Sequence, residues 1–490
     1  MKRLLACFSL PSPCLIVAFA ISPSNPRASR ITKPLQKNSP AEAHTARSEW
    51  FGDAAPSFVF RPIHYLGSKL RILEAIGQAV DRVDPSGGPV CDLFSGSATV
   101  SRYLSQHRRV LAVDVQEYGR VLAEAVLNGH PTWSAALVEK SLSDDDRGQA
   151  IRRAVEPLIR FENEAAKSAM RGDIEPLCQL LELGNLASLS ANNFPISSQL
   201  SKAVHESQGR IDALALSGAE TVCVRHFGGQ YFSYAQAVEL DAIADLARDH
   251  RNSVMLAAAL STASHLVNSI GKQFAQPIRP RDKFGVPKRH IVKKILLERS
   301  LSARSVFMGY LRQYERLAVN RHDHVAVRAD FREILANPTF KPAVVYADPP
   351  YTRDHYSRFY HSLETIALGD DPLITNSNLG GGKLQSRGGY RAGRHQSPFC
   401  IKSEAPAAFS ALFGGVAALN VPLVLSYSGY DPSTEARPRV MALDAVIDLA
   451  RKHFAQVEVQ QLMNLEHMKL NKTSLNKAAN GTTEILLLCR

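Results

Sequence analysis

The sequence predicts an α/β protein in which a doubly wound, mostly parallel sheet is interrupted by a mainly helical insertion. Residues 90–115 have the pattern strand, glycine turn, helix, strand, which is the first βαβ unit of such a sheet. Residues from about 120 to 320 have a helical pattern, with loops expected near 186–210 and 225–234. Short apolar strands alternate with helices again from residue 324 onward, so the two flanking segments are predicted to build one sheet.

The first half of the sheet is expected to begin near Trp50. The expected elements are a helix over 70–80, strands over 90–94 and 109–115, and a helix over 99–105 between the two strands. The run from Asp84 to Gly88 ends the first helix because it contains a proline and two glycines. The second strand leads to Asp114, so this carboxylate is expected at the carboxyl edge of the sheet.

The second half of the sheet follows the same logic. The expected elements are a strand over 324–328 that leads to Asp330, a helix over 331–336, strands over 343–347 and 421–427, and a closing hairpin formed by 454–462 and 483–488. Residues 377–397 are rich in Gly, Arg and Ser and are expected to form a mobile loop. Residues 227–232 combine glycines with aromatic residues, and they are expected to be either a packed turn or a ligand-facing loop.

The size and charge of the chain limit the classes of protein to consider. A chain of 490 residues with 45% hydrophobic residues predicts two or three folded units. The expected division is a tail over 1–45, a first part of the sheet domain over 46–120, a helical insertion over 121–320 and a second part of the sheet domain over 321–490. The formal charge of +12 favours a polyanionic partner, above all nucleic acid. An anionic small substrate, or no special partner, stays open at this point.

The cysteines and the N-terminus bear on the compartment. The seven cysteines form no CxxC pair and no Cys/His cluster, which argues against a disulfide framework or a zinc site and favours a reducing, cytoplasmic location. Residues 2–21 have the outline of a signal peptide, but Pro11 and Pro13 interrupt the apolar run. A disordered tail, or a true start further along the chain, is therefore preferred over secretion. No other apolar run is long enough to span a membrane.

The sharpest motif is Asp348-Pro349-Pro350-Tyr351, which directly follows an apolar strand. Ligand sites of open α/β sheets lie at the carboxyl ends of strands. The prolines fix the backbone and provide no N–H donor, so nearby carbonyls and the Asp348 carboxylate are expected to accept hydrogen bonds from an amine. Tyr351 offers a flat face on which a base can stack. A plain strand-end turn with a solvated aspartate is the alternative for the tetrapeptide taken alone.

A second group of residues fits a nucleotide-like cofactor. Gly96, within the turn Asp92-Leu93-Phe94-Ser95-Gly96-Ser97, allows a ligand to approach the backbone closely. Asp114 is positioned to bind ribose hydroxyls, and Asp330 to bind an adenine amine. Lys69, preceded by Tyr65 and Gly67, is positioned to contact a cofactor carboxylate. Each of these features taken singly also fits an ordinary strand-end carboxylate or surface lysine.

Taken together in this order, these motifs resemble the D12 class of adenine-N6 DNA methyltransferases, the Dam-like alpha group. The resemblance covers roughly residues 60–120 and 325–490, including the stretch that follows Tyr351. It implies a class I S-adenosylmethionine-dependent methyltransferase fold, Rossmann-like and doubly wound, with target recognition in the helical insertion. The family's second glycine is replaced by the Ser97-Ala98 pair, which affects the expected cofactor affinity rather than the fold.

The resemblance also implies roles. Asp348, Pro349, Pro350 and Tyr351 would act at the target amine. The cofactor S-adenosyl-L-methionine would be held by Tyr65, Gly67, Lys69, Asp92, Phe94, Gly96, Asp114, Asp330 and Asp348. The implied partner is double-stranded DNA, with the adenine flipped out of the duplex. The implied setting is restriction-modification, where a cognate restriction endonuclease would be a further partner. No catalytic metal is expected.

A basic cluster within the insertion is the expected DNA contact. Residues 271–304 hold ten Lys or Arg residues and only two acids. The expected phosphate and base contacts are Lys272, Arg279, Arg281, Lys283, Lys288, Arg289, Lys293 and Lys294. A solvated basic helix face is the alternative. Arg387, Arg391 and Arg394 are weaker candidates.

Three rival functions are retained. The first is an amino methyltransferase that acts on cytosine N4 or on RNA, and the second is a DNA-binding protein of the same fold that has lost catalysis. The third, a secreted binding protein, rests only on the first 21 residues. The intact Asp348 motif and the motif order favour adenine-N6 methylation.

Overall fold

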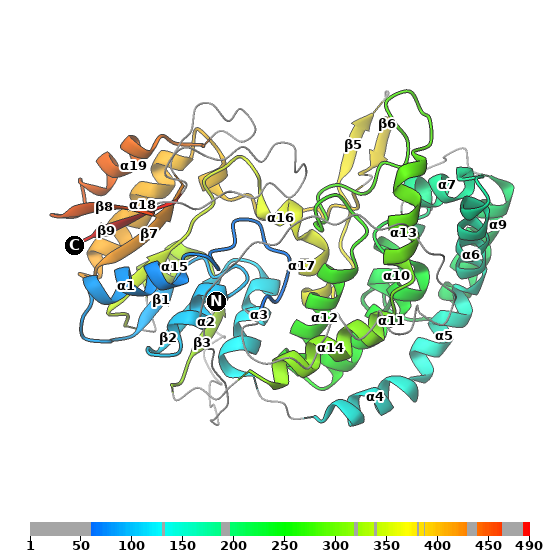
Figure 1. Cartoon of the computed structure of the whole chain (residues 1–490), viewed down its shortest axis with the longest axis horizontal. Coiled ribbons are helices and arrows are strands. Elements are labelled where there is room, and N and C mark those ends of the chain that lie inside the picture. The colour runs from blue at the N-terminus through cyan, green and yellow to red at the C-terminus, as the bar shows by residue number, and fades with distance from the viewer. Residues whose placement is uncertain are drawn as a thin grey trace, which may run out of the picture.

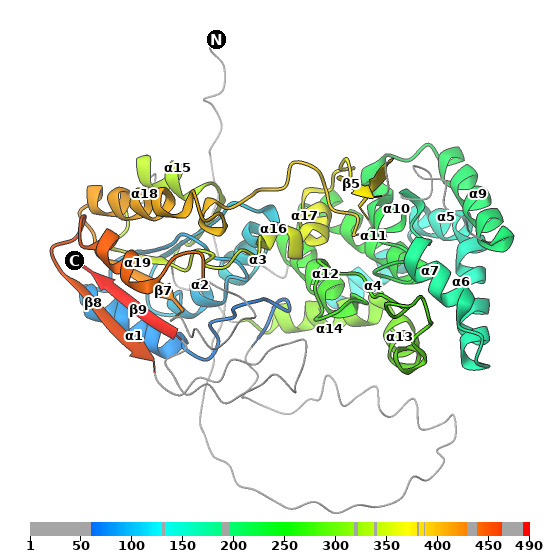
Figure 2. The same ribbon diagram turned by 90° about the horizontal axis from the view of Figure 1, so that it is seen from above.

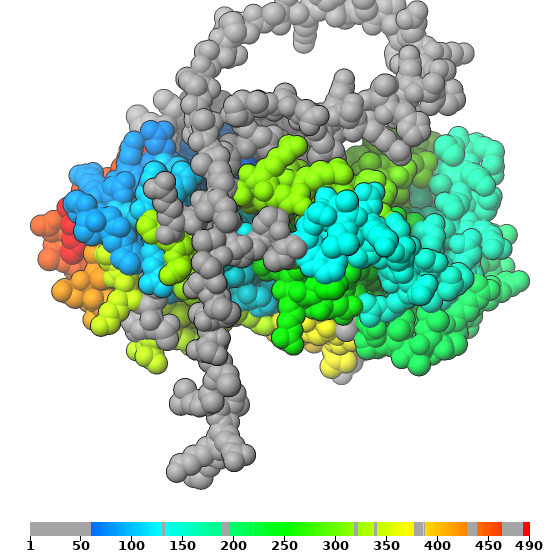
Figure 3. Space-filling model, turned by 90° about the horizontal axis from the view of Figure 1, so that it is seen from below, coloured from blue at the N-terminus to red at the C-terminus, as the bar shows by residue number. Residues whose placement is uncertain are grey.

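The computed structural model describes residues 60–129, 133–187, 197–317, 322–337, 341–379, 382–386, 388–428, 439–462 and 484–490. The expected tail over 1–45 and Arg387 lie outside the described residues. The sheet with its helices forms one side of the molecule and a group of helices forms the other (Figure 1). In the space-filling view, the helical residues coloured cyan to green fill the right-hand side, and the blue and orange sheet residues fill the left-hand side (Figure 3).

In the described part of the chain the main sheet has seven strands, and they confirm the strands predicted from the sequence. They are β1 Val90–Asp92, β2 Val110–Asp114, β3 Val325–Arg328, β4 Val344–Ala347, β7 Leu423–Tyr427, β8 Val457–Leu462 and β9 Glu484–Cys489. Their order is β3-β2-β1-β4-β7-β9-β8. The first five run parallel, whereas β9 is antiparallel to both β7 and β8. The expected closing hairpin is therefore present.

Alternate residues of each strand point to opposite faces of the sheet, and helices cover both faces. One face packs against α1 Leu73–Val83, α2 Thr99–Leu104 and α3 Glu117–Asn128. The other packs against α15 Phe331–Ala336, α18 Ala405–Ala418 and α19 Leu443–Ala450. In β4, for example, Val344 and Tyr346 belong to the first core and Val345 to the second. Figure 2 shows α1 below the sheet and α15 and α18 above it.

The insertion is mainly helical, as predicted. Its helices are α4 Ala135–Ser143, α5 Asp146–Ala154, α6 Glu156–Met170, α7 Glu175–Leu183, α9 Ser198–Ala213, α10 Val222–His226, α11 Tyr234–Asp249, α12 Ser253–Leu266, α13 Val292–Arg299 and α14 Ala303–Glu315, with 3-10 turns at Gly218–Thr221 and Arg289–Ile291. Helix α12 is buried on nearly all sides and joins the two parts by packing on α3, α11 and α14. The expected boundary at residue 120 falls within α3. This division of the chain into domains stays a prediction.

A buried ion pair ties several elements of the insertion together. The Arg299 guanidinium donates to Glu162 at 2.7 Å and to the carbonyls of Gly229 and Phe232, both at 3.0 Å. The other Glu162 oxygen accepts from the backbone N–H of Tyr234. The aromatic side chains of the 227–232 segment are almost completely buried, so this segment is a packed turn and not a ligand-facing loop.

Two expected loops are corrected by the structure. Within 186–210, α9 occupies Ser198–Ala213: the Ser197 hydroxyl caps its start, and a spaced set that includes Leu200, Val204 and Ile211 is buried. The many polar residues on its other face had masked this helical period. Within 377–397, β5 Asn376–Leu379 pairs antiparallel with β6 Gly382–Gln385. Pairing of two such short segments depends on backbone hydrogen bonds and leaves no periodic apolar pattern to recognise.

Three further elements complete the described chain: α16 Tyr356–Phe359, α17 His361–Leu368 and a 3-10 turn at Pro398–Cys400. Among the described residues, no helix is both long and apolar enough to cross a membrane. The five cysteines in the described part, including Cys91 and Cys489, are buried and form no disulfides.

Candidate active site

One cavity at the carboxyl ends of the parallel strands collects most of the residues that were singled out from the sequence. The expected residues that line it are Tyr65, Gly67, Lys69, Asp92, Phe94, Asp114, Asp330, Asp348 and Pro350. Gly96 lies between Ser95 and Ser97, which both line the cavity. Pro349 and Tyr351 do not line it. In the sheet, β2 lies on one side of β1 and β4 lies on the other. The cavity lies at this point, where the strand order reverses, and open α/β sheets bind ligands at such a position.

The Asp348 carboxylate is held by a buried ionic cluster. The Lys69 ammonium lies 3.1 Å from Asp348 Oδ1 and 3.5 Å from Glu484 Oε1. Only 5% of the Lys69 side chain is exposed, so the ammonium depends on these carboxylates for solvation. Lys69 was expected to contact a cofactor carboxylate, but here its contacts are with Asp348 and Glu484. The lysine therefore links the loop before α1 to the ends of β4 and β9.

The electrostatics of this cluster favour a proton-accepting Asp348. Burial is the main cause that raises the pKa of Asp348 to about 6, Glu484 raises it further, and Lys69 opposes both. For Lys69, burial works against the charged form, but Asp348 and Glu484 outweigh it and hold the pKa well above its usual value. Two carboxylates thus share one ammonium. Near neutral pH the cluster contains an ionised acceptor whose pKa is close to the working pH.

Within the described part of the chain, one of the backbone carbonyls that were expected to accept a hydrogen bond from an amine, that of Pro349, is free to do so. Among the described residues, none donates a hydrogen bond to the carbonyl of Pro349, whereas the Tyr351 carbonyl accepts from Val440 N–H at 3.0 Å. The Tyr351 hydroxyl donates to Glu484 at 3.4 Å. Two cations lie near the Tyr351 ring, with Lys69 Nζ at 5.5 Å and Arg439 Cζ at 4.9 Å from its centroid. The role of Tyr351 as a stacking face for a base stays a prediction.

The glycine turn after β1 is shaped by Tyr65 and Asp114. Gly96 has φ +52°, and its N–H donates to Asp114 Oδ2 at 2.9 Å. A Cβ at this position would lie 2.5 Å from the Tyr65 hydroxyl oxygen. The Tyr65 ring stacks on Tyr360 with a centroid distance of 5.2 Å. Glycine is therefore required both for the left-handed backbone and for the close approach of Tyr65.

The cavity lining fits a nucleoside that also carries hydrogen-bond donors. Asp92 accepts from the Ser101 hydroxyl at 2.6 Å through Oδ2, while its buried Oδ1 has no partner among the described residues. Burial raises the pKa of Asp92 to about 7 and that of Asp114 to about 6. Aromatic rings of Phe94, Phe331 and Phe399 contact one another along the wall. An unpartnered carboxylate oxygen beside an aromatic wall suits hydroxyl or amino groups attached to a flat ring.

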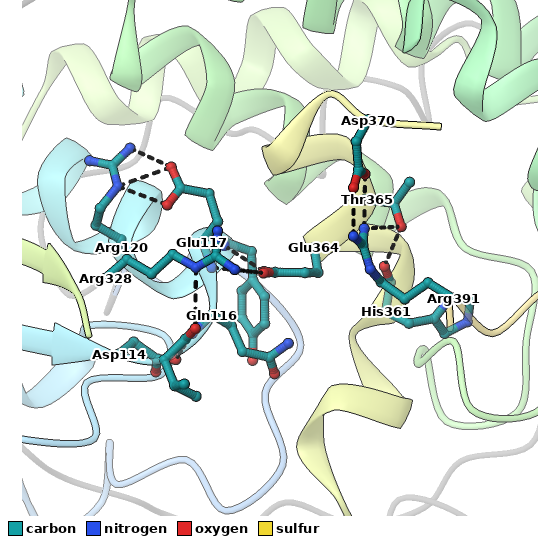
Figure 4. Close-up of polar contacts among 12 residues, drawn as sticks. Asp114, Gln116, Glu117, Arg120, Arg328, His361, Glu364, Thr365, Asp370 and Arg391 are labelled. Carbon is teal, nitrogen blue, oxygen red and sulfur yellow. Dashed lines mark hydrogen bonds and ion pairs between the residues drawn. The ribbon is translucent and has the colours of Figure 1, made fainter. Parts of the chain in front are cut away.

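A polar network connects this cavity with the helix that follows the Asp348 motif. Glu364 on α17 accepts from the backbone N–H groups of Glu117 and Tyr118 at 3.1 and 3.0 Å, at the start of α3 (Figure 4). Arg328 on β3 lies 3.6 Å from Glu364. Asp114 Oδ1 also accepts from Gln116 N–H at 2.8 Å, so the loop between β2 and α3 is held from both sides.

The basic cluster is divided into engaged and exposed cations. Arg281 forms ion pairs with Glu175 at 2.6 Å and Glu182 at 2.9 Å, and Lys272 lies 3.0 Å from Glu298. These two side chains were expected on the DNA, but the structure uses them to join loops to helices. Exposed members of the cluster are Arg279, Lys283, Arg289, Lys293 and Lys294, while Lys288 is partly exposed. Lys294 makes only a long contact of 3.8 Å with Glu298.

Sequence reasoning missed several residues of the cavity and its ionic cluster. Glu484 was read only as part of a closing strand, and Tyr356, Ser357 and His395 were not assigned to the cavity that they line. A signal existed for Tyr356 and Ser357, since they follow the Asp348 motif closely. No local signal marks Glu484, because its contact with Lys69 joins residues 415 positions apart.

The crowding at Gly96 leads to a stability prediction. We expect Gly96→Ala to lower the free energy of unfolding by more than Gly87→Ala. Both glycines have positive φ, but a Cβ at Gly87 would meet no atom within 4 Å. Placing an alanine in a left-handed backbone costs about 1–2 kcal/mol at either site. Only Gly96→Ala adds the clash with Tyr65. Urea unfolding measures both variants, and Tyr65→Ala in the Gly96→Ala background should remove the excess. Equal costs for the two glycines would contradict this explanation.

The comparisons with known proteins agree with this geometry. The family model described as D12 class N6 adenine-specific DNA methyltransferase matches residues 65–148 and 244–379. The chain is 23% identical over 427 residues to "Modification methylase LlaI" of Lactococcus lactis subsp. lactis, which covers 87% of this chain and 54% of that protein. The chain therefore spans about half the length of this relative. No solved structure matches the chain significantly. The matched segments contain Lys69, the glycine turn and the Asp348 motif, and over these segments the chain is similar to the D12 class of N6 adenine-specific DNA methyltransferases.

Proposed function

We propose that this protein methylates the N6 amine of adenine in double-stranded DNA at a specific site, in a restriction-modification setting. The observation that carries the proposal is Asp348, a largely buried acceptor with a raised pKa, in one cavity with the glycine turn and Asp114. A D12-class family match and a relative named a modification methylase support the reaction type. A cognate restriction endonuclease would be the natural partner of such an activity.

The fold assignment that accompanies this function is the class I S-adenosylmethionine-dependent methyltransferase fold. Its support is the strand order β3-β2-β1-β4-β7-β9-β8, with β9 as the inserted antiparallel strand and helices on both faces. The helical insertion is proposed as the target-recognition part. The first five strands, all parallel, bring the ends of β1, β2 and β4 to one edge, where a cofactor and a base can meet.

The proposed cofactor is S-adenosyl-L-methionine, which supplies an electrophilic methyl group. Asp92 Oδ1 and Asp114 are proposed to accept from its hydroxyl and amino groups, and Phe94 to pack against its adenine ring. Asp330 lines the same cavity but also caps α15 by accepting from Arg332 N–H at 2.9 Å, so its remaining oxygen would bind the adenine amine. Tyr65, Gly67 and Gly96 shape the space in which the amino-acid end would lie.

The chemistry at the target amine follows from two acceptors. Asp348 and the Pro349 carbonyl are proposed to accept the two hydrogens of the adenine N6 amine, while Pro350 keeps the turn rigid. This arrangement directs the nitrogen lone pair out of the ring plane and toward the methyl group. As the N–C bond forms, the bond between the methyl group and the donor sulfur would break and leave a neutral thioether. The nitrogen would then carry one surplus proton, and the Asp348 carboxylate is placed to take it. Catalysis would rest on positioning and electrostatics, with no covalent enzyme intermediate.

The DNA is proposed to lie across the insertion, with the target adenine turned out of the duplex into the cavity. The exposed cations Arg279, Lys283, Arg289, Lys293 and Lys294, with the partly exposed Lys288, would contact phosphates. Lys272 and Arg281 would support this surface from behind through their ion pairs.

The first test is removal of the acceptor. We expect Asp348→Ala to abolish methylation while cofactor binding is largely kept, because Asp348 contacts the target amine and not the donor side of the methyl group. Methylation-sensitive sequencing of plasmid DNA from cells that express each variant measures turnover and maps the recognition site. The control is Asp444→Ala, an exposed carboxylate on α19. Turnover of Asp348→Ala within tenfold of wild type would refute the assignment, and modified cytosine or RNA would favour the corresponding rival activity.

The second test uses the charge of Glu484. Asp348 must be ionised to accept the amine, so kcat/KM should fall as the pH drops below about 6. Glu484→Gln removes one cause that raises the pKa of Asp348, so the acidic limb should move to lower pH. The matched control is Glu458→Gln on β8, where the carboxylate is 41% exposed and pairs with Arg82. An acidic limb that stays in place would assign it to another group, such as Asp92 or Asp114.

The third test concerns the basic surface. Replacing Lys288, Arg289, Lys293 and Lys294 together by Ala should weaken DNA binding for all sequences and flatten its salt dependence, by about 0.9 in slope for each phosphate that the variant no longer binds. Cofactor affinity should barely change, because these residues do not line the cofactor cavity. Affinity is measured against salt concentration. An unchanged slope would make the cluster a solvated face, and loss of site preference at unchanged slope would make its members base readers.

A further inference from the structure

A second cavity lies between residues 275–285, which form a basic loop, and the segment 375–394, which contains the β5–β6 hairpin. It has a volume of about 760 Å³, and four arginines line it: Arg279 and Arg281, which are close together in the chain, and Arg358 and Arg394 from two other segments. Its two carboxylates are already engaged. Glu182 pairs with Arg281 at 2.9 Å, and Asp282 accepts from the backbone N–H groups of Phe284 and Val286. The cavity therefore has a surplus of positive charge.

Arg358 and Arg394 share one aromatic ring. Their guanidinium carbons lie 5.2 and 5.1 Å from the centroid of Tyr390. Tyr390 is fixed in turn, since its hydroxyl donates to the Ala275 carbonyl and its own carbonyl accepts from Thr375 N–H. Among the described residues, no carboxylate lies within ion-pair distance of either arginine. Two cations held on one ring without a counter-charge form a site for an anion, and planar guanidinium groups suit phosphate oxygens.

In two segments of the chain, neighbouring residues line the cofactor cavity and the second cavity. Tyr356 and Ser357 line the cofactor cavity, and the next residue, Arg358, lines the second one. The same change occurs between His395 and Arg394. Consecutive Cα atoms are about 3.8 Å apart, so two separate segments each pass from one cavity to the other within a single residue. A nucleotide with its base in the first cavity would have its phosphate near the second.

We infer that Arg358 and Arg394, held on Tyr390, bind a backbone phosphate adjoining the adenosine that enters the neighbouring cavity. This inference rests on the proposed function and names a contact for it that lies outside the 271–304 cluster. Burial and the nearby Arg358 lower the pKa of Arg394, in line with two like charges that lack an anion between them. Phosphate is the shared chemistry, and a DNA phosphodiester is the source that the position beside the Asp348 motif favours.

The test combines a double variant with a modified duplex. Arg358→Gln/Arg394→Gln is compared with Arg289→Gln/Lys293→Gln, which removes two exposed cations that do not line this cavity. The duplex carries the mapped site, either natural or with one neutral methylphosphonate. The modification is placed on either side of the target adenine, or at a phosphate outside the site. Dissociation constants are measured for each protein on each duplex, and thermal melting checks that the variants are folded.

We expect the wild type to lose about tenfold in affinity when a phosphate beside the target adenine is neutral, and the Arg358/Arg394 variant to lose nothing further there. The Arg289/Lys293 variant should stay as sensitive to this modification as the wild type. Independent, additive effects of the variant and the modification would overturn the inference, as would sensitivity only at the remote phosphate. Arg358→Lys/Arg394→Lys keeps the charges without the planar donors and should recover only part of the affinity.

The proposed function can fail separately from this inference. Methylation by the wild type is measured on the natural duplex in parallel. If no methyl transfer and no site are found, salt dependence on a duplex of arbitrary sequence still tests the arginines. A slope reduced by about 1 in the Arg358/Arg394 variant would then support phosphate binding without catalysis. An unchanged slope would refute the inference whatever the activity.

Discussion

The buried ion pair between Lys69 and Asp348, with Glu484 beside it, is the interaction on which the rest of the site depends. It joins a loop before the first helix, the end of β4 and the start of β9. A buried ammonium without a partner would cost several kcal/mol, so the three segments must come together for the site to fold. One ammonium facing two carboxylates leaves a surplus negative charge. That surplus, added to burial, keeps the pKa of Asp348 close to neutral.

The strand order explains why these residues meet. β1 lies between β2 and β4, and β9 lies on the other side of β7, so the carboxyl ends of β1, β2 and β4 share one edge. β9 runs in the opposite direction, and its first residue, Glu484, therefore faces the same edge. An all-parallel arrangement would bring the last residue of that strand here instead. The antiparallel strand thus supplies a carboxylate beside Lys69 and Asp348.

The helical part serves the site through rigid contacts. Glu364 on α17 holds the start of α3, and α12 packs against both helices. The helix that follows the Asp348 motif and the start of α3 are therefore held together by direct contacts. The buried Arg299–Glu162 pair fixes the turn at 227–232, and Arg281 fixes the basic loop to α7. Arg281 and Arg299 thus hold loops of the insertion in place through their ion pairs. In the part of the chain that the structure describes, the exposed cations of the basic cluster are not engaged in this way and remain available to a polyanion.

The sequence by itself determined the sheet strands, most of the helices and many of the cavity residues. Alternating or continuous apolar runs and short motifs are local signals, and residues at strand ends gather at one edge in any parallel sheet. Only the tertiary structure decided which charges meet. The contact of Lys69 with Glu484, the engagement of Lys272 and Arg281, and the stacking of two arginines on Tyr390 join residues distant in the chain. Helix α9 and the β5–β6 hairpin were missed for a related reason: polar residues outnumber apolar ones along α9, and strand pairing is a backbone property. Long-range pairing depends on how elements pack, and no local pattern encodes it.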